Sequence, residues 1–265
     1  MLACPVDLLP LERDDRAYTC ARGHAYDISR EGYVNLLSPG GPSRKKAGDD
    51  KASIAARRRF LDAGHYMALS DALAATVAAL PHDAVVDVGC GEGYYTARLP
   101  GDAVFGVDIS SAGVKAAART YPSATFAVGN ASALPIVSAS VDVAVSVFAP
   151  VVPDEFARVV APGGHAVVAV PGAEHLAAVR AQLYAVARPH DEVVPLTDDE
   201  RFELVGEERI STVITIATDD VLDDLLTMTP YRFAVPPDAV ARAAASPTPL
   251  DTPIAFVLAV LRRCL

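Results

Sequence analysis

An apolar run that leads into evenly spaced glycines is the feature that most constrains how this chain can fold. The run is Val85–Val88 with Asp87 inside it, and the glycines are Gly89, Gly91 and Gly93. Glycines let the backbone turn sharply and approach a ligand closely, which a Cβ would prevent. A second apolar run ends at Asp108, roughly 20 residues after the first glycine, where open α/β sheets place a ribose-binding acid. The segment therefore predicts a cofactor-binding loop at the edge of a sheet.

Short apolar runs alternate with helical segments from residue 84 onward. Strands are expected at 85–88, 104–107, 125–128, 141–147 and 165–170, with a helix at 94–99 after the glycines. This rhythm predicts an α/β fold with an open parallel sheet covered by helices. A helix around 176–187, strands at 210–217 and 254–261, and a helix at 221–228 between them predict an antiparallel end to that sheet.

The chain before residue 84 divides into a small module and a connecting part. Residues 1–37 are turn-rich and hold Cys4, Asp7, Cys20 and His24, whereas residues 38–43 are a Pro/Gly/Ser cluster that reads as a linker. Helices are expected at 52–63, ended by Gly64, and at 69–80, ended by Pro81. We expect three parts: a module at 1–37, a linker with helices at 38–83, and a catalytic domain at 84–265.

Charge is distributed unevenly along the chain. The net charge is −10, yet residues 1–66 carry 11 Lys/Arg against 9 Asp/Glu, and residues 67–265 carry 12 against 24. The acidic body argues against bulk attraction to nucleic acid, so any polyanion contact is expected at the basic triplets 44–46 and 57–59. The alternative is that both triplets are solvated faces.

Targeting and redox signals are missing from the sequence. No apolar stretch reaches the ~20 residues that span a bilayer, and the first ten residues lack a secretion signal, so we expect a cytoplasmic protein without a membrane partner. Four cysteines in such a protein argue against a disulfide framework. The remaining interpretations of the four cysteines are metal binding and burial in the core.

Two cofactors compete for the glycine loop. A dinucleotide pyrophosphate would be repelled by Asp87 and by Glu92 inside the loop. S-adenosylmethionine carries no phosphate, and carboxylates favour its sulfonium and ammonium groups, so this cofactor is expected; a mere tight turn is the remaining alternative. Asn130, after the third strand, is expected at the adenine edge unless it only forms a turn. Phe148, after the fourth strand, either stacks on a planar substrate or belongs to the core.

Several longer segments carry a family resemblance. They are the Cys-bearing start, Gly-Tyr-Val-Asn-Leu-Leu at 32–37, Arg-Arg-Phe-Leu-Asp-Ala-Gly-His-Tyr at 58–66, the loop at 87–96, Ala-Arg-Val-Val-Ala-Pro-Gly-Gly at 157–164, His-Leu at 175–176 and Met-Thr-Pro at 228–230. With them the chain resembles the bacterial 23S ribosomal RNA guanine-N1 methyltransferases of the RlmA type, which include macrolide-resistance members. The segments at 32–37 and 60–66 are specific to this family.

The resemblance implies a complete functional assignment. It implies a zinc-ribbon-like N-terminal module that grips RNA, a Rossmann-like class I methyltransferase sheet, a homodimer, and methylation of N1 of a guanine in a 23S rRNA hairpin. By the same likeness Tyr66, Tyr95, Thr96 and His175 line the S-adenosylmethionine site. They would join Asp87, Gly89, Gly91, Gly93, Asp108 and Asn130 there.

The sequence departs from the family at the metal. The family pattern is Cys-x2-Cys followed by Cys-x3-His, whereas this chain has Cys4-x2-Asp7 followed by Cys20-x3-His24. Zinc accepts a carboxylate oxygen, so these four residues can still form a four-coordinate Zn²⁺ site. The alternative is a module that has lost its metal.

Two further functions stay open at this stage. The acidic body and the altered metal pattern suit a small-molecule, secondary-metabolite methyltransferase derived from the rRNA enzyme. A non-catalytic protein that binds cofactor or RNA is the other. Guanine N1 must lose a proton during transfer, and the sequence singles out no residue to accept it.

Overall fold

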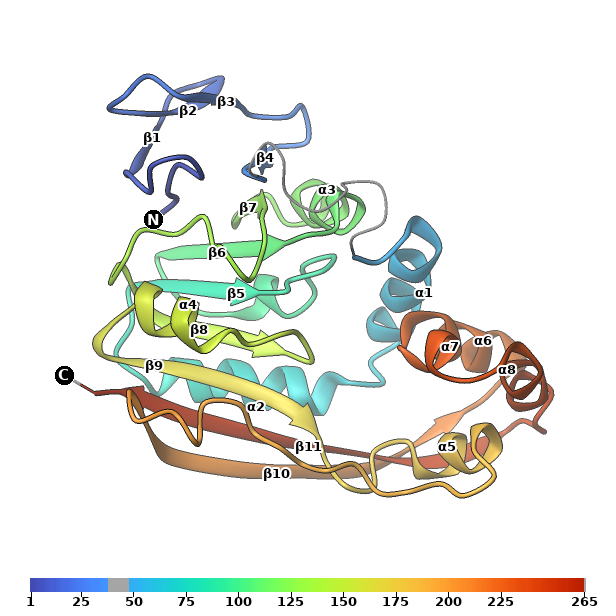
Figure 1. The fold of residues 1–265 in the computed structure, drawn as a ribbon. Coiled ribbons are helices and arrows are strands. Elements are labelled where there is room, and N and C mark those ends of the chain that lie inside the picture. Colours follow the sequence, from blue (N-terminus) through green and yellow to red (C-terminus); the bar gives the residue numbers. More distant parts are fainter. Residues whose placement is uncertain (38–47, 265) are drawn as a thin grey trace.

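The computed structural model describes residues 1–37 and 48–264, and an eight-stranded sheet forms its centre (Figure 1). The strand order is β10-β11-β9-β8-β5-β6-β7-β4. Their bounds are β4 (Val34–Asn35), β5 (Ala84–Val88), β6 (Ala103–Asp108), β7 (Thr125–Val128), β8 (Val141–Val147), β9 (Val160–Pro171), β10 (Phe202–Ile216) and β11 (Leu250–Arg263). Neighbours from β4 to β9 pair in parallel, and β11 pairs antiparallel with both β9 and β10. The predicted α/β class and antiparallel end are confirmed.

Strand order reverses at β5, which lies between β6 and β8. In open α/β sheets the reversal leaves a crevice at the carboxyl ends of the strands, and ligands bind there. The glycine loop follows β5 directly, so the fold puts this loop at the binding edge of the sheet.

Helices cover both faces of the sheet. They are α1 (Lys51–Asp62), α2 (Met67–Ala78), α3 (Ser111–Thr120), α4 (Pro153–Val159), α5 (Ala177–Leu183), α6 (Asp219–Met228), α7 (Tyr231–Ala234) and α8 (Pro237–Ala244). Side-chain caps begin several of them: Asp50 accepts from the Ser53 amide in α1, and Ser110 accepts from the Gly113 amide in α3.

The core has two main layers, one on each face of the sheet. One layer packs α1, α2, α5, α6 and α8 against alternate residues of β8, such as Val143 and Val145. The other packs α4 and the N-terminal module against the opposite face, where Val86 and Ala144 point. Alternation of buried residues between the layers explains why these strands read as continuous apolar runs.

The N-terminal module is docked on the eight-stranded sheet. It holds the antiparallel sheet β1 (Leu11–Arg13), β2 (Ala17–Cys20) and β3 (Ala25–Asp27). Leu2 lies in the second core layer, and the Ala3 amide donates to the Pro135 carbonyl at 2.9 Å. Strand β4 extends the main sheet beside β7, so residues on both sides of position 37 contribute to one sheet. The domain boundaries remain a prediction.

Some predicted elements differ from the structure. The helix expected at 94–99 is wrong: only a 3-10 turn, η1 (Thr96–Arg98), follows the glycines. The late strands are longer than predicted, since β10 begins at Phe202 and β11 at Leu250. The linker at 38–43 and the triplet at 44–46 lie outside the described residues. Within the described part of the chain, no helix is long and apolar enough to cross a membrane.

Candidate functional site

The loop after β5 is shaped by glycines in the left-handed region. Gly89 has φ 83° and Gly93 has φ 84°, a conformation that residues with a side chain rarely adopt. A Cβ on Gly89 would lie 2.2 Å from the Cβ of Ala149, so a side chain there would collide with the turn after β8. The loop is thus wedged between β6 and the segment that follows β8.

Asp108 ties the loop to the end of β6. Its carboxylate accepts hydrogen bonds from the Gly91 amide at 2.9 Å and the Ser110 amide at 2.6 Å. Burial raises the pKa of Asp108, and these two amide donors oppose the rise. The carboxylate therefore lies where the sequence predicted a ribose-binding acid, against the backbone of the glycine loop.

Asn130 follows β7 at the same edge as Asp108. The Gly129 amide donates to the Asp108 carbonyl at 2.9 Å, which brings the two segments together. The Asn130 side-chain oxygen accepts from the Ser132 amide at 2.9 Å, which is the bond of an Asx turn. The turn role is therefore real, and the side-chain NH2 of Asn130 is the group left to meet a ligand.

Two buried acids flank the glycines. Asp87 is 2% exposed and accepts from the Thr96 hydroxyl at 2.6 Å, which joins two residues that the sequence assigned to the site. Burial raises the pKa of Asp87 to about 7. Glu92 is 4% exposed, and burial likewise raises its pKa to about 7, although nearby Arg57 opposes the rise. Both carboxyls thus titrate near neutral pH.

Arg57 is a site residue that the sequence reading missed. Its guanidinium lies 3.8 Å from the Glu92 carboxylate and 2.5 Å from that of Asp49, and it donates to the Met228 carbonyl at 3.2 Å. A Cβ on Gly91 would lie 3.3 Å from it. Arg57 lies on α1 and therefore contacts the glycine loop from outside it. Its position in a basic triplet did not predict this contact.

The other two arginines of the 57–59 triplet are also paired within the chain. Arg58 donates to the Thr120 hydroxyl at 3.0 Å and lies near Asp62, while Arg59 forms a two-pronged ion pair with Asp224. Paired arginines have less charge to offer to phosphates. This weakens the expectation that the triplet contacts RNA.

A pair of aromatic side chains closes the site near β11. The Tyr66 hydroxyl and His175 Nε2 are 3.1 Å apart, and the Ala255 amide donates to His175 Nδ1 at 3.3 Å. Because Nδ1 accepts, Nε2 carries the imidazole proton and donates to Tyr66. Burial lowers the pKa of His175 to about 3, with smaller contributions from His190 and Arg180, so the ring stays neutral at physiological pH.

Arg180 fixes the segment that carries His175. It is 4% exposed and donates to the carbonyls of His175 at 2.9 Å and Ala173 at 2.7 Å, and to that of Arg188. A buried guanidinium satisfied by three carbonyls holds the backbone on both sides of α5 in place.

Two buried polar atoms in this region lack a hydrogen bond among the described residues. They are the hydroxyl of Tyr95 and Oε2 of Glu92, an oxygen that has an ion-pair partner in Arg57 at 3.8 Å but accepts no hydrogen bond. Buried polar groups are nearly always satisfied, so unmatched ones beside a ligand loop indicate groups that a ligand would meet. Together with the carboxyls of Asp87 and Asp108 they fit a cofactor that is cationic at sulfur and nitrogen and carries a ribose.

A second cluster lies in the N-terminal module. The ligand atoms of Cys4, Asp7, Cys20 and His24 all lie within 4.8 Å of one another. His24 Nδ1 is 3.4 Å from each cysteine sulfur and 3.3 Å from the Asp7 carboxylate. The edges of a tetrahedron of Zn ligands at ~2.0–2.3 Å from the metal are of this length. The structure thus brings the four predicted ligands together, in a set compatible with Zn²⁺.

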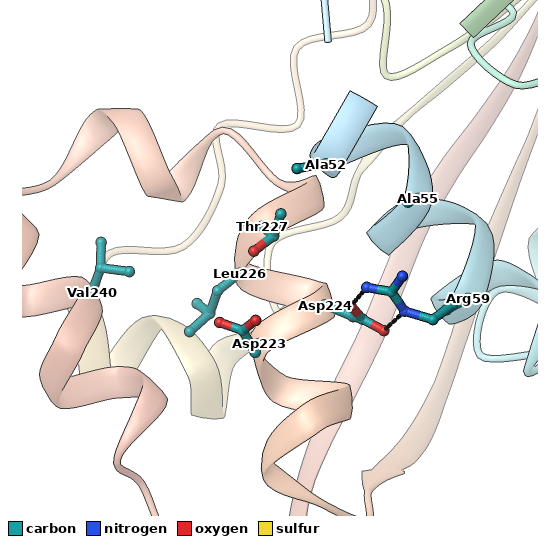
Figure 2. Close-up of a pocket in the computed structure, with 8 residues that line it drawn as sticks. All are labelled: Ala52, Ala55, Arg59, Asp223, Asp224, Leu226, Thr227 and Val240. Carbon is teal, nitrogen blue, oxygen red and sulfur yellow. Dashed lines mark hydrogen bonds and ion pairs between the residues drawn. The ribbon is translucent and has the colours of Figure 1, made fainter. Parts of the chain in front are cut away.

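A separate pocket of about 500 Å³ lies between α1, α6 and α8 (Figure 2). Its polar wall is formed by Arg59 with Asp223 and Asp224, and Figure 2 shows the ion pair of Arg59 with Asp224 across it. None of the predicted site residues lines this pocket. Because its lining includes none of the residues around the glycines, the glycine loop remains the candidate site.

Family models match two parts of the chain. Residues 2–46 match the N-terminal zinc-ribbon model of RlmA, and residues 85–164 match a methyltransferase domain model. A solved structure described as "a putative methyltransferase" from Bacillus halodurans C-125 has a similar fold, with a TM-score of 0.51, 15% identity, and coverage of 73% of this chain and 98% of that one. The chain thus carries a methyltransferase domain with the class I fold, preceded by a segment that matches a zinc ribbon.

Two proteins of similar sequence indicate which methyltransferases this chain resembles. The 23S rRNA (guanine(748)-N(1))-methyltransferase of Streptomyces fradiae is 38% identical over 160 residues, 56% of this chain and 55% of that protein. A "Putative 23S rRNA (guanine-N(1)-)-methyltransferase" of Micromonospora griseorubida is 40% identical over 174 residues, 56% of this chain and 58% of that protein. The matches thus span little more than half of each relative. They confirm the resemblance to the RlmA type, a zinc ribbon followed by a methyltransferase domain.

Proposed function

We propose that this chain transfers the methyl group of S-adenosylmethionine to N1 of a guanine in a 23S rRNA hairpin. The observation that carries the proposal is a cysteine- and histidine-bearing ribbon docked on the sheet of a methyltransferase domain. Two relatives named as guanine-N1 methyltransferases support it. An rRNA substrate also favours a cytoplasmic location. The family resemblance supports a homodimer.

Different residues of the site hold different parts of the cofactor in this proposal. Asp108 accepts the ribose hydroxyls, and the Asn130 NH2 donates to the adenine. Asp87 and Glu92 balance positive charge, Tyr66 and His175 form the wall beside β11, and Tyr95 and Thr96 line the site after the glycine loop. When bound, S-adenosylmethionine supplies an electrophilic methyl group on a sulfonium.

Catalysis in such a site comes mainly from positioning. Displacement at a methyl group needs the acceptor nitrogen in line with the bond that breaks, so rigid walls contribute much of the rate. Arg180 and the Tyr66–His175 pair keep the wall beside β11 rigid. A target guanine in a loop is more easily withdrawn from its stack than one in a duplex.

Zinc is proposed for the ribbon, held by Cys4, Asp7, Cys20 and His24. A bound metal would cross-link the loop before β1 to the turn after β2 through these four side chains. The ribbon would then present exposed side chains such as Arg16 and Arg22 to RNA. Ribbon charge alone does not attract RNA strongly, because residues 1–37 carry 4 Lys/Arg and 6 Asp/Glu.

A small-molecule methyltransferase is the second candidate. The observation in its favour is that every arginine of the 57–59 triplet is engaged with a carboxylate of the chain itself, on an acidic body. Labelled methyl transfer to protein-free 23S rRNA and to the small-molecule fraction of a cell extract separates the two. Label in rRNA supports the first candidate, and label only in small molecules supports the second.

A further inference from the structure

Phe148 is an exposed aromatic residue at the point where β8 ends. Its side chain is 42% exposed, whereas Tyr66, His175 and Phe256, whose rings surround it, are 4%, 6% and 1% exposed. The ring centroids of these neighbours lie 6.4, 6.2 and 5.6 Å from that of Phe148. We call these four residues the aromatic cluster. Phe148 is the member that offers a ring face to a ligand.

The backbone at Phe148 is held in an unusual conformation. Its φ is 54°, in the left-handed region that bulky residues rarely adopt. The Phe148 amide donates to the Ala169 carbonyl at 3.1 Å, and the Ser146 hydroxyl donates to the Ala149 carbonyl at 3.1 Å. Strain that is held by specific bonds and that exposes an apolar ring is not explained by core packing.

This turn adjoins the methyl-donor site. Ala149, the next residue, is the one that a Cβ on Gly89 would strike, at 2.2 Å. Tyr66 and His175 of the aromatic cluster belong to the proposed cofactor wall. Phe148 therefore stands at the border between the cofactor loop and solvent, where an acceptor must enter.

We propose that Phe148 is the stacking face for the methyl-acceptor base, with the buried rings of the aromatic cluster as its support. A planar base withdrawn from RNA loses its stacking neighbours, and an exposed aromatic face replaces them without reading sequence. This inference rests on the proposed function, since it assumes that the acceptor is a nucleobase.

His190 stands at the edge of this arrangement. Its ring lies 6.2 Å from that of His175, its Nε2 is 3.3 Å from the Tyr231 hydroxyl, and its amide donates to the Ala173 carbonyl at 3.1 Å. The segment that Arg180 fixes thus carries both histidines. A base on Phe148 would be bordered on this side by imidazole rings, which suits a planar ligand with polar edges.

The test compares Phe148→Ala and Phe148→Tyr with the wild-type protein on protein-free 23S rRNA. Loss of the ring is expected to lower kcat/KM for rRNA by about 5- to 150-fold, the factor equivalent to one base–aromatic stack. The tyrosine variant keeps the ring face and is expected within about threefold of wild type. Val213→Ala, which removes an exposed apolar side chain far along β10, serves as the control.

Calorimetry with S-adenosylmethionine accompanies each variant. The Phe148→Ala protein is expected to bind cofactor within about twofold of wild type, which also reports that it is folded. Equal rRNA kinetics for wild type and Phe148→Ala would overturn the inference alone. A parallel loss of cofactor affinity would also overturn it, because Phe148 would then belong to the cofactor site. Absence of rRNA methylation by the wild-type protein would instead contradict the proposed function.

Discussion

At the scale of single residues, Asp108 carries much of the proposed cofactor contact. Asp108→Asn keeps the shape of the side chain but removes the charge that would accept two ribose hydroxyls. Cofactor affinity is expected to fall by about 5- to 150-fold, equivalent to about 1–3 kcal/mol for hydrogen bonds to a charged group. Calorimetry checks this, with Asp102→Asn in an exposed turn as the control. An unchanged dissociation constant would remove Asp108 from the site.

Glu92 predicts how stability depends on pH. Its pKa is about 7 in the folded protein, above the ~4.3 of an exposed glutamate, so between these values the folded state binds more protons than the unfolded state. The contribution of Glu92 is therefore fully present below about pH 4 and is lost as the pH rises through 7. Chemical denaturation of the wild type and of Glu92→Gln at pH 5, 6, 7 and 8 measures the free energy of unfolding of each protein. The wild type should lose stability relative to the variant as the pH rises; a constant difference would show that Glu92 has an ordinary pKa.

The same buried acids predict how cofactor affinity depends on pH. Ionised Asp87 and Glu92 attract a sulfonium, so S-adenosylmethionine affinity is expected to rise as the pH passes through 7. S-adenosylhomocysteine shares every group except the charged sulfur, and its affinity should rise less. Titrations of both ligands from pH 6 to 8 compare the slopes. Parallel slopes would contradict an electrostatic role for the two acids.

Residue patterns that are local in sequence predicted that the glycine loop and Asp108 would meet. The glycine spacing and Asp108 lie within one strand-loop-strand unit, so their meeting follows from the fold. Arg57 was not predictable, because its partners Asp49, Glu92 and Met228 come from three separate segments. The sequence predicted the charge of Arg57 but not which residues its side chain would contact.

At the scale of elements, the proposed metal site of the N-terminal module predicts how substitutions of Asp7 change zinc affinity. Asp7→Ala removes one of four ligands and is expected to weaken zinc binding by at least about tenfold, while Asp7→Cys restores the family pattern and should tighten it. Competition with a chromophoric chelator measures both, and Asp27→Ala, an exposed acid at the end of β3, is the control. Equal zinc affinity in the wild-type and Asp7→Ala proteins would show that Asp7 is not a ligand.

Element positions followed from periodicity, and element lengths did not. Helices α1 and α2 and the five parallel strands of the core lie within a few residues of their predicted ranges, except that β9 begins earlier, at Val160. The helix expected after the glycines failed because residues 94–96 turn inward: Thr96 bonds to Asp87, and the ring of Tyr95 lies partly buried. Tertiary contacts there override the helical composition.

At the scale of the whole molecule, the docked ribbon lies at one end of the sheet and α8 at the other (Figure 1). Arg22→Glu reverses an exposed charge beside the proposed metal site, and Arg242→Glu on α8 is a matched control. The ribbon variant is expected to bind rRNA several-fold more weakly, with less salt dependence, because one phosphate contact is lost. Filter binding across a salt series measures this. Equal losses for both variants would argue against the ribbon as an RNA contact.

The docking of the ribbon was beyond sequence reasoning. Nothing local indicates that Leu2 bridges to Ile136, or that Val34 and Asn35 add a strand beside β7, since these contacts join segments about 90 to 130 residues apart. Such packing buries apolar surface on the face that α4 leaves open, which stabilises the module through the larger domain.

The most direct test of the central claim is methyl transfer to protein-free 23S rRNA. The full chain is incubated with labelled S-adenosylmethionine, and the rRNA is digested to nucleosides and separated by mass. The account predicts that the label in rRNA is found in N1-methylguanosine. Label that appears only in other nucleosides, or only in the small-molecule fraction of a cell extract, would contradict it.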